Sequence, residues 1–160
     1  MQLSELLAPE RVRVPLAGRD KDGLLRELVE LVAAERGPEV GEALLRSVRD
    51  REAVLSTGIG EGVAIPHGRS PLLDSLVVAA GVCAQPVPFD ALDGEPVTLC
   101  FLIAGPESAA GAHVRALGRI SRVLRDDRLR AALRASRTAE EFLTVVREAE
   151  SAGAAPGTAR

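Results

Sequence analysis

Apolar residues recur along the chain with two different spacings, and the alternation of these spacings predicts a mixed α/β fold. In some segments they return every three or four positions, as on one face of a helix. These segments are a short one ending before Pro9, 20–35, one that follows Gly37-Pro38, 113–125, 127–135 and one opened by the capping box Thr138-Ala139-Glu140-Glu141.

Other segments are continuously apolar or alternate with polar residues, which are the patterns of β-strands. The long apolar runs 76–83 and 97–104 are rich in β-branched residues and predict strands buried on both faces. Three shorter candidates precede a proline or an Asp-Gly turn: 12–14, 63–65 and the edge segment 87–94. Helices in pairs around about five strands predict a three-layer α/β/α sandwich with a mixed sheet.

Length and composition place these elements in one domain. The chain has 160 residues, 46% of them hydrophobic, which is enough to bury a core without a disulfide or a metal. We expect residues 1–150 to form the domain and residues 151–160, which are small, polar and rich in glycine and proline, to form a disordered tail.

The same composition predicts a cytoplasmic protein without membrane insertion. No stretch of about 18 apolar residues occurs, and the first residues lack the pattern of a secretory signal. Cys83 and Cys100 lie inside apolar runs, which is typical of buried thiols in a reducing compartment.

Charge and aromatic content argue against binding to nucleic acid. Twenty basic residues stand against 23 acidic ones, for a net charge of −3, whereas nucleic-acid binders carry a basic excess. Aromatic residues make up only 2% of the chain, which leaves few platforms for stacking bases.

The segment with the least regular pattern is glycine-rich and leads to a histidine. Residues 56–62 read Ser-Thr-Gly-Ile-Gly-Glu-Gly, which indicates a loop that bends tightly or approaches a ligand. The next strand ends at Pro66, so we expect His67 at a strand terminus, with Gly68 leaving room for a ligand to approach. Loop N–H groups and the hydroxyls of Ser56 and Thr57 could form an anion-binding concavity. The alternative is a surface histidine at a capped strand end.

The second of the two histidines, His113, is expected in the first turns of a helix and on its apolar face. Positions 113, 117, 120 and 124 are His, Leu, Ile and Leu. An imidazole there can donate a hydrogen bond to an anion, helped by the positive end of the helix dipole. The alternative is a buried histidine bonded to a backbone carbonyl. Because the chain has only two histidines, their pairing is a hypothesis worth testing.

Other chemistries lack their sequence signatures. The histidines and cysteines include no short-range ligand pair for zinc, and Ser56 and Thr57 lack the elbow of an acyl-transfer nucleophile. The only lysine, Lys21, lies outside any Walker motif. No metal and no cofactor are therefore expected. A histidine that itself carries a phosphoryl group remains, because neutral imidazole with a pKa of about 6.5 is nucleophilic near pH 7.

The residues around His67 resemble the type 2 (fructose–mannitol class) enzyme IIA domain of the bacterial phosphoenolpyruvate-dependent phosphotransferase system (PTS). That family's signature places an acidic or amide residue seven positions before an aliphatic–Gly pair. The motif aliphatic-Ala-aliphatic-Pro-His-Gly follows two residues later. Every position of this signature is filled here, by Glu52, Ile59-Gly60 and Val63-Ala64-Ile65-Pro66-His67-Gly68. The similarity covers nearly the whole chain before the tail.

The resemblance implies that His67 accepts a phosphoryl group from phosphohistidine on the carrier protein HPr, or a paralogue, and forms a tele-phosphohistidine intermediate. The residues themselves leave both ring nitrogens open. The group then passes to an acceptor, commonly a cysteine of a IIB domain. The resemblance also implies that His113 hydrogen-bonds the phosphoryl site and that Arg51 contributes positive charge. It places a phosphate-binding loop at Thr57, Gly58, Gly60 and Glu61.

No IIB or IIC segment accompanies the IIA pattern, and a solitary IIA resembles the nitrogen-related, regulatory branch of the family. In that branch the phosphorylation state changes the binding of regulatory target proteins. Two alternatives stay open. One is a sugar-specific IIA that serves a separately encoded IIB, and the other is a protein-binding module that keeps the fold without phosphotransfer.

Overall fold

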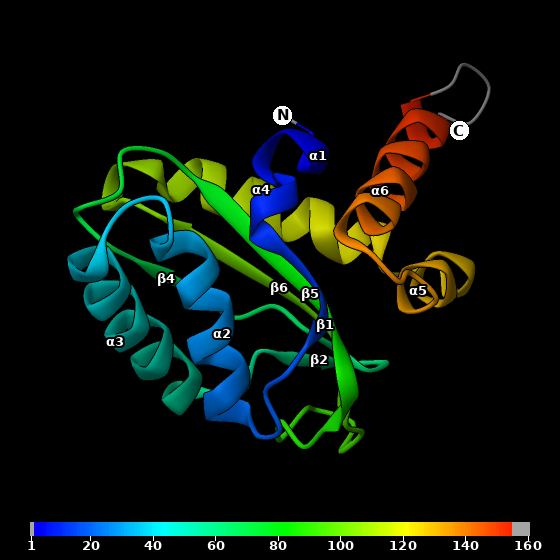
Figure 1. The fold of residues 1–160 in the computed structure, drawn as a ribbon, viewed down its shortest axis with the longest axis horizontal. Coiled ribbons are helices and arrows are strands. Elements are labelled where there is room, and N and C mark those ends of the chain that lie inside the picture. Colours follow the sequence, from blue (N-terminus) through cyan, green and yellow to red (C-terminus); the bar gives the residue numbers. More distant parts are fainter. Residues whose placement is uncertain (1, 155–160) are drawn as a thin grey trace.

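The structure is a computed structural model that describes residues 2–154, and it confirms the expected mixed α/β class (Figure 1). Its main elements, in chain order, are α1 (Leu3–Leu6), β1 (Val12–Leu16), α2 (Lys21–Ala33), α3 (Pro38–Val54), β2 (Gly58–Gly60), β3 (Val63–Ala64), β4 (His67–Arg69), β5 (Val77–Val87), β6 (Val97–Gly105), α4 (Ala110–Val123), α5 (Asp127–Arg134) and α6 (Ala139–Ala154). Short 3₁₀ turns at Pro9–Arg11 and Glu107–Ala109 precede β1 and α4.

The six strands form one mixed sheet in the order β1-β5-β6-β3-β2, and β4 also pairs with β6. The long β5 and β6 are antiparallel, with Val77 opposite Ala104 and Val82 opposite Leu99. In contrast, β1 runs parallel to β5, and both β3 and β4 run parallel to β6. The pair β5–β6 is therefore the centre of the sheet, and the short strands β3 and β4 lie end to end along one side of β6.

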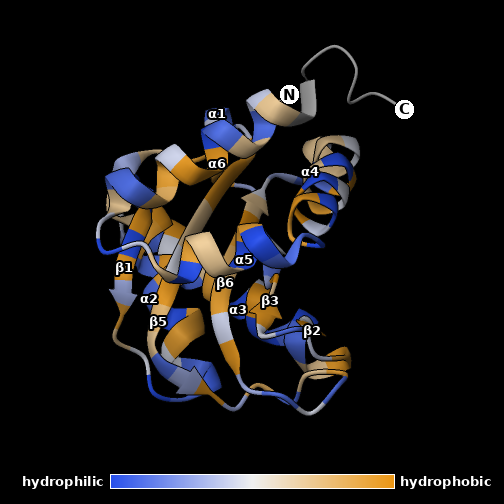
Figure 2. Cartoon of the chain, turned by 90° about the vertical axis from the view of Figure 1, so that its right-hand side faces the viewer, coloured by the Kyte–Doolittle hydropathy of each residue, from blue (hydrophilic) through white to orange (hydrophobic). Residues whose placement is uncertain are grey.

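Side chains of the central strands alternate between two buried cores, one on each face of the sheet. Ala79 and Leu102 pack with α2 and α3, whereas Val78 and Phe101 pack with α1, α4, α5 and α6. Figure 2 shows apolar residues gathered on the strands and on the helix faces turned toward them. Because both faces of the sheet are covered, the central strands are continuously apolar, and the three layers agree with the prediction.

The glycine-rich segment is not wholly a loop, because it contains β2, one of two strands, with β4, that were not among the expected five. Gly58 and Gly60 pair with Ala64 and Val63, which makes β2 and β3 a small antiparallel hairpin. Its turn needs glycine, because Gly60 has φ +100° and Gly62 has φ +76°. Sequence periodicity missed β2 because its glycines carry no side-chain pattern.

The prediction that His67 stands at the end of a strand is also corrected. β3 does end at Ala64, but pairing with β6 resumes at β4, where His67 lies opposite Ile103. Pro66 lacks an N–H group, yet its carbonyl accepts the N–H of Ile103 at 3.0 Å. His67 therefore belongs to a short strand of the sheet, which fixes its backbone on β6.

The expected edge segment 87–94 divides into the end of β5 and a turn. Val87 is the last residue of β5 and lies opposite Val97 of β6. Beyond it, the N–H of Gly94 donates to the carbonyl of Ala91 at 2.9 Å, and Gly94 has φ +75°. The Asp-Gly turn is thus confirmed, whereas the strand portion extends an element that was predicted to end at residue 83.

The C-terminal helix begins where the sequence predicts and extends further. The hydroxyl of Thr138 accepts the N–H of Glu141 at 3.1 Å, while the Glu141 carboxylate accepts the N–H of Arg137 at 2.7 Å. α6 then reaches Ala154, four residues into the range predicted as a tail. Glu150, 7% exposed, accepts the N–H groups of Leu3 and Ser4, so packing against α1 carries the helix past the compositional boundary. Residues 155–160 lie outside the described residues, and the division at residue 150 stays a prediction.

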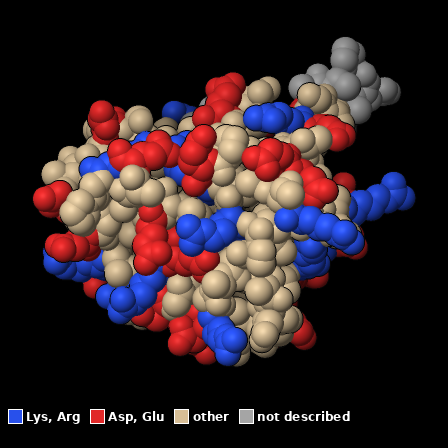
Figure 3. Space-filling view, in the orientation of Figure 1, with Lys and Arg blue, Asp and Glu red and all other residues tan. Residues whose placement is uncertain are grey.

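Charged side chains are intermingled on the surface over α2 and α3 (Figure 3). Asp22 of α2 forms ion pairs with Arg26 at 2.9 Å and with Arg49 of α3 at 2.8 Å. Hydrogen bonds from Arg49 and Arg26 lower the pKa of Asp22 to about 2.

Within residues 2–154, no helix has the length and hydropathy needed to cross a bilayer.

We expect Gly81→Ala to destabilise the fold strongly. A Cβ at Gly81, in the middle of β5, would lie 2.3 Å from the carbonyl oxygen of Arg13 and 2.6 Å from Cγ of Leu16. This steric clash can be relieved only if β1 moves away from β5, which should lower the free energy of unfolding by about 3 kcal/mol. Urea unfolding measures this loss. The matched control is Gly118→Ala, since a Cβ there meets nothing within 4 Å and alanine favours the helix by about 1 kcal/mol. Equal stability of the two variants would contradict the prediction.

Candidate functional site

The rings of the two histidines are in contact between the sheet and α4. His67 comes from β4, and His113 is the fourth residue of α4. Their ring centroids are 5.2 Å apart, and the ring planes cross at 72°. The structure therefore brings together two side chains that lie 46 positions apart in the sequence, as the pairing hypothesis expected.

The hydrogen bond of His67 defines the tautomer of its ring. Nδ1 lies 3.0 Å from the carbonyl oxygen of Ile65. A carbonyl only accepts hydrogen bonds, so Nδ1 carries the proton of the neutral ring. Nε2 then keeps its lone pair, so it is the ring nitrogen that remains free to act as an acceptor.

His113 is a buried neutral histidine with a missing partner. The residue is only 6% exposed and shares its buried helix face with Ala116 and Ile120, as the helical periodicity predicts. Its Nε2 atom is buried and has no hydrogen-bond partner. Burial, followed by the nearby His67 and Arg69, lowers the pKa of His113 to about 4. The ring is therefore uncharged at neutral pH and offers a polar atom in a site that a ligand can complete.

We expect the buried His113 to make the protein less stable in mild acid. Its folded-state pKa of about 4 lies below the ordinary value of 6.5, so between these pH values the unfolded chain binds the proton more readily. Stability is therefore full above about pH 6.5 and falls as the pH decreases toward 4. Urea unfolding at pH 7 and pH 4 should show the wild type losing about 3 kcal/mol more than His113→Gln. Equal losses in the two proteins would contradict this prediction.

Two arginines place positive charge beside the histidines. Arg51 lies in the last turn of α3, where its Nη1 donates to the carbonyl of Leu55 at 2.7 Å. Arg69 lies two residues after His67 on β4 and forms an ion pair with Glu107 at 2.7 Å. The pKa of His67 is lowered by burial and by both arginines, against the opposing influence of the Ile65 carbonyl and Glu52. Both cations are thus near enough to act electrostatically on His67.

Arg69 was not assigned to the site from the sequence, although a signal for it exists. Alternation along a strand places residues i and i+2 on the same face, and β4 contains both His67 and Arg69. The signal was missed because His67 was expected to end its strand. Arg69 also lowers the pKa of His113, which shows that its charge reaches both rings.

Three of the N–H groups predicted to bind an anion, those of Thr57, Gly58 and Glu61, have partners within the chain. The Glu52 carboxylate accepts the N–H of Thr57 at 3.0 Å and its hydroxyl at 2.6 Å. The N–H of Gly58 donates to the hydroxyl of Ser56 at 3.0 Å. Thr57 and Gly58 therefore brace the hairpin, and Thr57 reaches the site only through its backbone.

The other two loop residues lie at the far turn of the hairpin. The N–H of Glu61 donates to Asp93 at 3.0 Å, and the Glu61 carboxylate lies 3.6 Å from Arg130. Arg134 donates to the Glu61 carbonyl at 2.5 Å, and a Cβ at Gly60 would contact Asp93. Gly60 and Glu61 thus face α5 and the 88–94 turn, and the structure does not bring them to the histidine pair.

Gly68 is required for helix packing and not for access by a ligand. A Cβ at this position would lie 2.7 Å from Cγ2 and 3.0 Å from the backbone nitrogen of Val48, on α3. The hydroxyl of Ser47 also accepts the N–H of Arg69 at 2.8 Å. Close contact with α3 therefore fixes β4 from the side opposite to the histidine pair.

The thiols lie away from the histidines. Cys83 and Cys100 belong to the core on the α2–α3 face and hydrogen-bond each other, which contributes to a lowered pKa for Cys83. Within residues 2–154 no cluster of three or more His, Cys, Asp or Glu side chains has the arrangement of a metal site. The arrangement of the two histidines favours nucleophilic and hydrogen-bonding chemistry.

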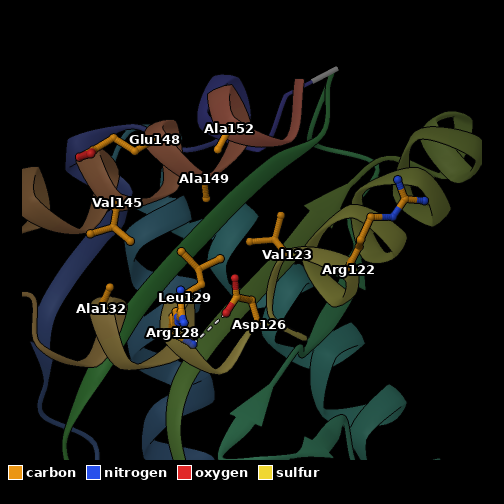
Figure 4. Close-up of a pocket in the computed structure, with 10 residues that line it drawn as sticks. All are labelled: Arg122, Val123, Asp126, Arg128, Leu129, Ala132, Val145, Glu148, Ala149 and Ala152. Carbon is orange, nitrogen blue, oxygen red and sulfur yellow. Dashed lines mark hydrogen bonds between the residues drawn. The ribbon is translucent and has the colours of Figure 1, made fainter. Parts of the chain in front are cut away.

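A groove of about 750 Å³ lies elsewhere, between the end of α4 and the helices α5 and α6 (Figure 4). Val123, Leu129 and Val145 contribute to its largely apolar lining, and Arg122 and Glu148 also border it. The lining residues include neither histidine, so the groove is separate from the site described above.

Comparisons with known proteins identify the family to which the chain belongs. Residues 5–149 match the family described as phosphoenolpyruvate-dependent sugar phosphotransferase system, EIIA 2. The match spans most of the chain, so the chain belongs to the EIIA type 2 family of the PTS. The resemblance drawn from the residues around His67 is confirmed.

Within that family the chain is similar to proteins named nitrogen regulatory protein. One from Bradyrhizobium diazoefficiens is 38% identical over 146 residues, covering 91% of this chain and 95% of the relative. The crystal structure of nitrogen regulatory protein IIA-Ntr from Neisseria meningitidis matches with a TM-score of 0.80 and 32% identity, covering 89% and 97% of the two chains.

A more distant neighbour shares the fold. It is enzyme IIA of the mannitol system from Escherichia coli, solved in complex with phosphorylated enzyme IIB. The TM-score is 0.73 with 19% identity, covering 89% of this chain and 97% of that one.

Proposed function

We propose that this chain is a phosphohistidine carrier of the nitrogen-related, regulatory type, which accepts a phosphoryl group on Nε2 of His67. The observation that carries the proposal is the bond from Nδ1 of His67 to the Ile65 carbonyl, which leaves Nε2 unprotonated. Membership of the EIIA type 2 family and similarity to nitrogen regulatory proteins support it.

In the proposed step, the Nε2 lone pair attacks the phosphorus of a phosphohistidine on the donor protein. The new P–Nε2 bond forms as the P–N bond of the donor breaks, and the donor imidazole leaves with that electron pair. His67 keeps its Nδ1 proton, so its ring becomes a phosphorylated cation. The Nδ1–H···O=C bond to Ile65 then becomes charge-assisted and stronger.

His113 and the arginines would stabilise the phosphoryl group during transfer. The unpartnered Nε2 of His113 would donate a hydrogen bond to a phosphoryl oxygen, because the neutral ring can carry its proton there. Arg51 and Arg69 would supply positive charge at the edge of the site, where phosphoryl transfer depends mainly on positioning and electrostatics. No cofactor enters this step.

The donor would be HPr or a paralogue, and a protein target would receive the group or recognise the phosphorylated chain. The mannitol neighbour was solved with phosphorylated IIB, so a sugar-system IIB is the second candidate acceptor. The regulatory function is favoured because the chain covers 95% of the nitrogen regulatory relative.

The proposal is tested by incubating the full chain with phosphoenolpyruvate, enzyme I and HPr. We expect an acid-labile, alkali-stable adduct on His67, and nitrogen NMR of the adduct should place the phosphorus on Nε2. Discharge of the adduct by a sugar-system IIB with coupled sugar phosphorylation would favour the sugar-specific alternative. Absence of any adduct with HPr and its paralogues would leave a protein-binding module as the explanation.

A further inference from the structure

Glu52 is a buried carboxylate with an unusually complete set of partners. The residue is 7% exposed and lies near the end of α3. Its oxygens accept the N–H of Thr57 at 3.0 and 3.1 Å and the Thr57 hydroxyl at 2.6 Å. Lys21 completes the set with an ion pair at 3.1 Å. A buried carboxylate with this many partners keeps the groups that bind to it in fixed positions.

Thr57 connects this carboxylate to His67 through Ile65. The Thr57 carbonyl accepts the N–H of Ile65 at 2.9 Å, and the Ile65 carbonyl accepts the Nδ1 proton of His67 at 3.0 Å. Both polar backbone groups of Ile65, itself 1% exposed, are therefore engaged. The contacts form an unbroken series from the Glu52 carboxylate on α3 to the His67 ring on β4.

Lys21 makes the buried charge tolerable. Its side chain is 25% exposed, and Nζ also lies 3.6 Å from Asp90 and 5.0 Å from the ring centre of Phe89. A buried carboxylate without a cation is costly, because its desolvation is not compensated. Asp90 and Phe89 help to hold the amine beside Glu52, where its positive charge compensates the buried carboxylate that accepts the bonds of Thr57.

We propose that Glu52 is a positioning residue that, through Thr57 and Ile65, holds His67 in the tautomer whose Nε2 can accept a phosphoryl group. The expected effect on the rate of transfer rests on the proposed function, whereas the expected effect on the tautomer of His67 does not. An imidazole without a fixed acceptor populates both tautomers. A displaced Ile65 carbonyl would therefore let part of the population place the proton on Nε2, where it blocks attack.

The charges around His67 give the proposal a second signature. The charged groups that act on the pKa of His67 are Arg51 and Glu52 on α3 and Arg69 on β4, and the ring of His113 on α4 lies against the ring of His67. Glu52 raises the pKa of His67, whereas both arginines lower it. Removing the Glu52 charge should therefore lower the pKa of His67 further and shift its titration to lower pH.

The test compares Glu52→Gln with Glu27→Gln as a matched control. Glu27 is also buried, at 8% exposure, and also accepts backbone N–H groups, those of Ala17 and Gly18, beside Arg13. Nitrogen-edited NMR of the imidazoles reports the tautomer and the titration of His67. Steady-state phosphorylation by the HPr-type donor reports kcat and KM separately.

We expect Glu52→Gln to show a mixed His67 tautomer, titration at lower pH and a kcat reduced about tenfold at unchanged KM. Glu27→Gln should retain the wild-type tautomer, titration and rate. A Glu52→Gln protein that keeps the Nδ1–H tautomer and the wild-type kcat would overturn the inference.

Two further variants keep the inference testable if Glu52→Gln does not fold. Thr57→Val removes only the hydroxyl bond to Glu52 and should give the same mixture of His67 tautomers as Glu52→Gln. Thr57→Ser, which keeps a hydroxyl, should retain the wild-type tautomer of His67. Unchanged tautomer populations in Thr57→Val would count against the inference. If the wild type forms no adduct with any donor, the proposed function fails, while the tautomer measurement still decides the role of Glu52.

Discussion

His67→Gln should form no phosphoryl adduct under conditions in which the wild type is fully modified. Glutamine removes the only nucleophilic nitrogen of β4, while its amide can still donate to the Ile65 carbonyl that now binds Nδ1. We do not expect His113 to substitute for it, because Nε2 of His113 is buried and, in the proposed step, carries the proton of the neutral ring. Radiolabelled phosphoenolpyruvate with enzyme I and HPr measures the loss.

The control for this variant is its folding, since His67 is half-buried and lies on a strand paired with β6. Circular dichroism and the urea midpoint should stay close to those of the wild type. Retention of an acid-labile adduct in a folded His67→Gln protein would assign the phosphoryl group to another residue and reject the proposed function.

His113→Ala should slow phosphorylation of His67 by about 10²–10³-fold without preventing it. The reason is that the variant removes the hydrogen-bond donor expected at the phosphoryl oxygen, while Nε2 of His67 remains available. Stability should change less than the rate, because the deleted Nε2 makes no hydrogen bond in the folded protein. Rapid-quench measurement of a single transfer reports the rate.

A comparison with His113→Gln separates hydrogen bonding from packing. The glutamine amide can donate to a phosphoryl oxygen and should recover part of the rate. If His113→Ala transfers at the wild-type rate and is merely less stable, the role of His113 is packing alone.

The sequence predicts the pair of histidines correctly because each depends on a local pattern. The apolar face of α4 directs His113 inward, and the strand signal before Pro66 directs His67 to the sheet. What the local pattern lacks is the register of β6, which extends pairing beyond Pro66 and turns a strand end into β4. For the same reason Arg69 was not assigned to the site.

The loop shows where sequence reasoning fails for a physical reason. Glycine content correctly indicates tight bends, as at Gly60 and Gly62. Whether its N–H groups are free depends on carboxylates that approach from other elements, Glu52 from α3 and Asp93 from the turn after β5. Those contacts are tertiary, so an apparent anion cradle is instead a braced hairpin.

The position of Lys21 affects how this protein can be handled. It is the chain's single lysine, and its amine is committed to the carboxylate that braces the histidine strand. Acylating dyes, amine cross-linkers and amine-coupled sensor surfaces would therefore act on the α-amino group or on this one ion pair. A sample derivatised at the lysine would have lost the counter-charge of Glu52, so labels for transfer kinetics belong on an introduced surface cysteine.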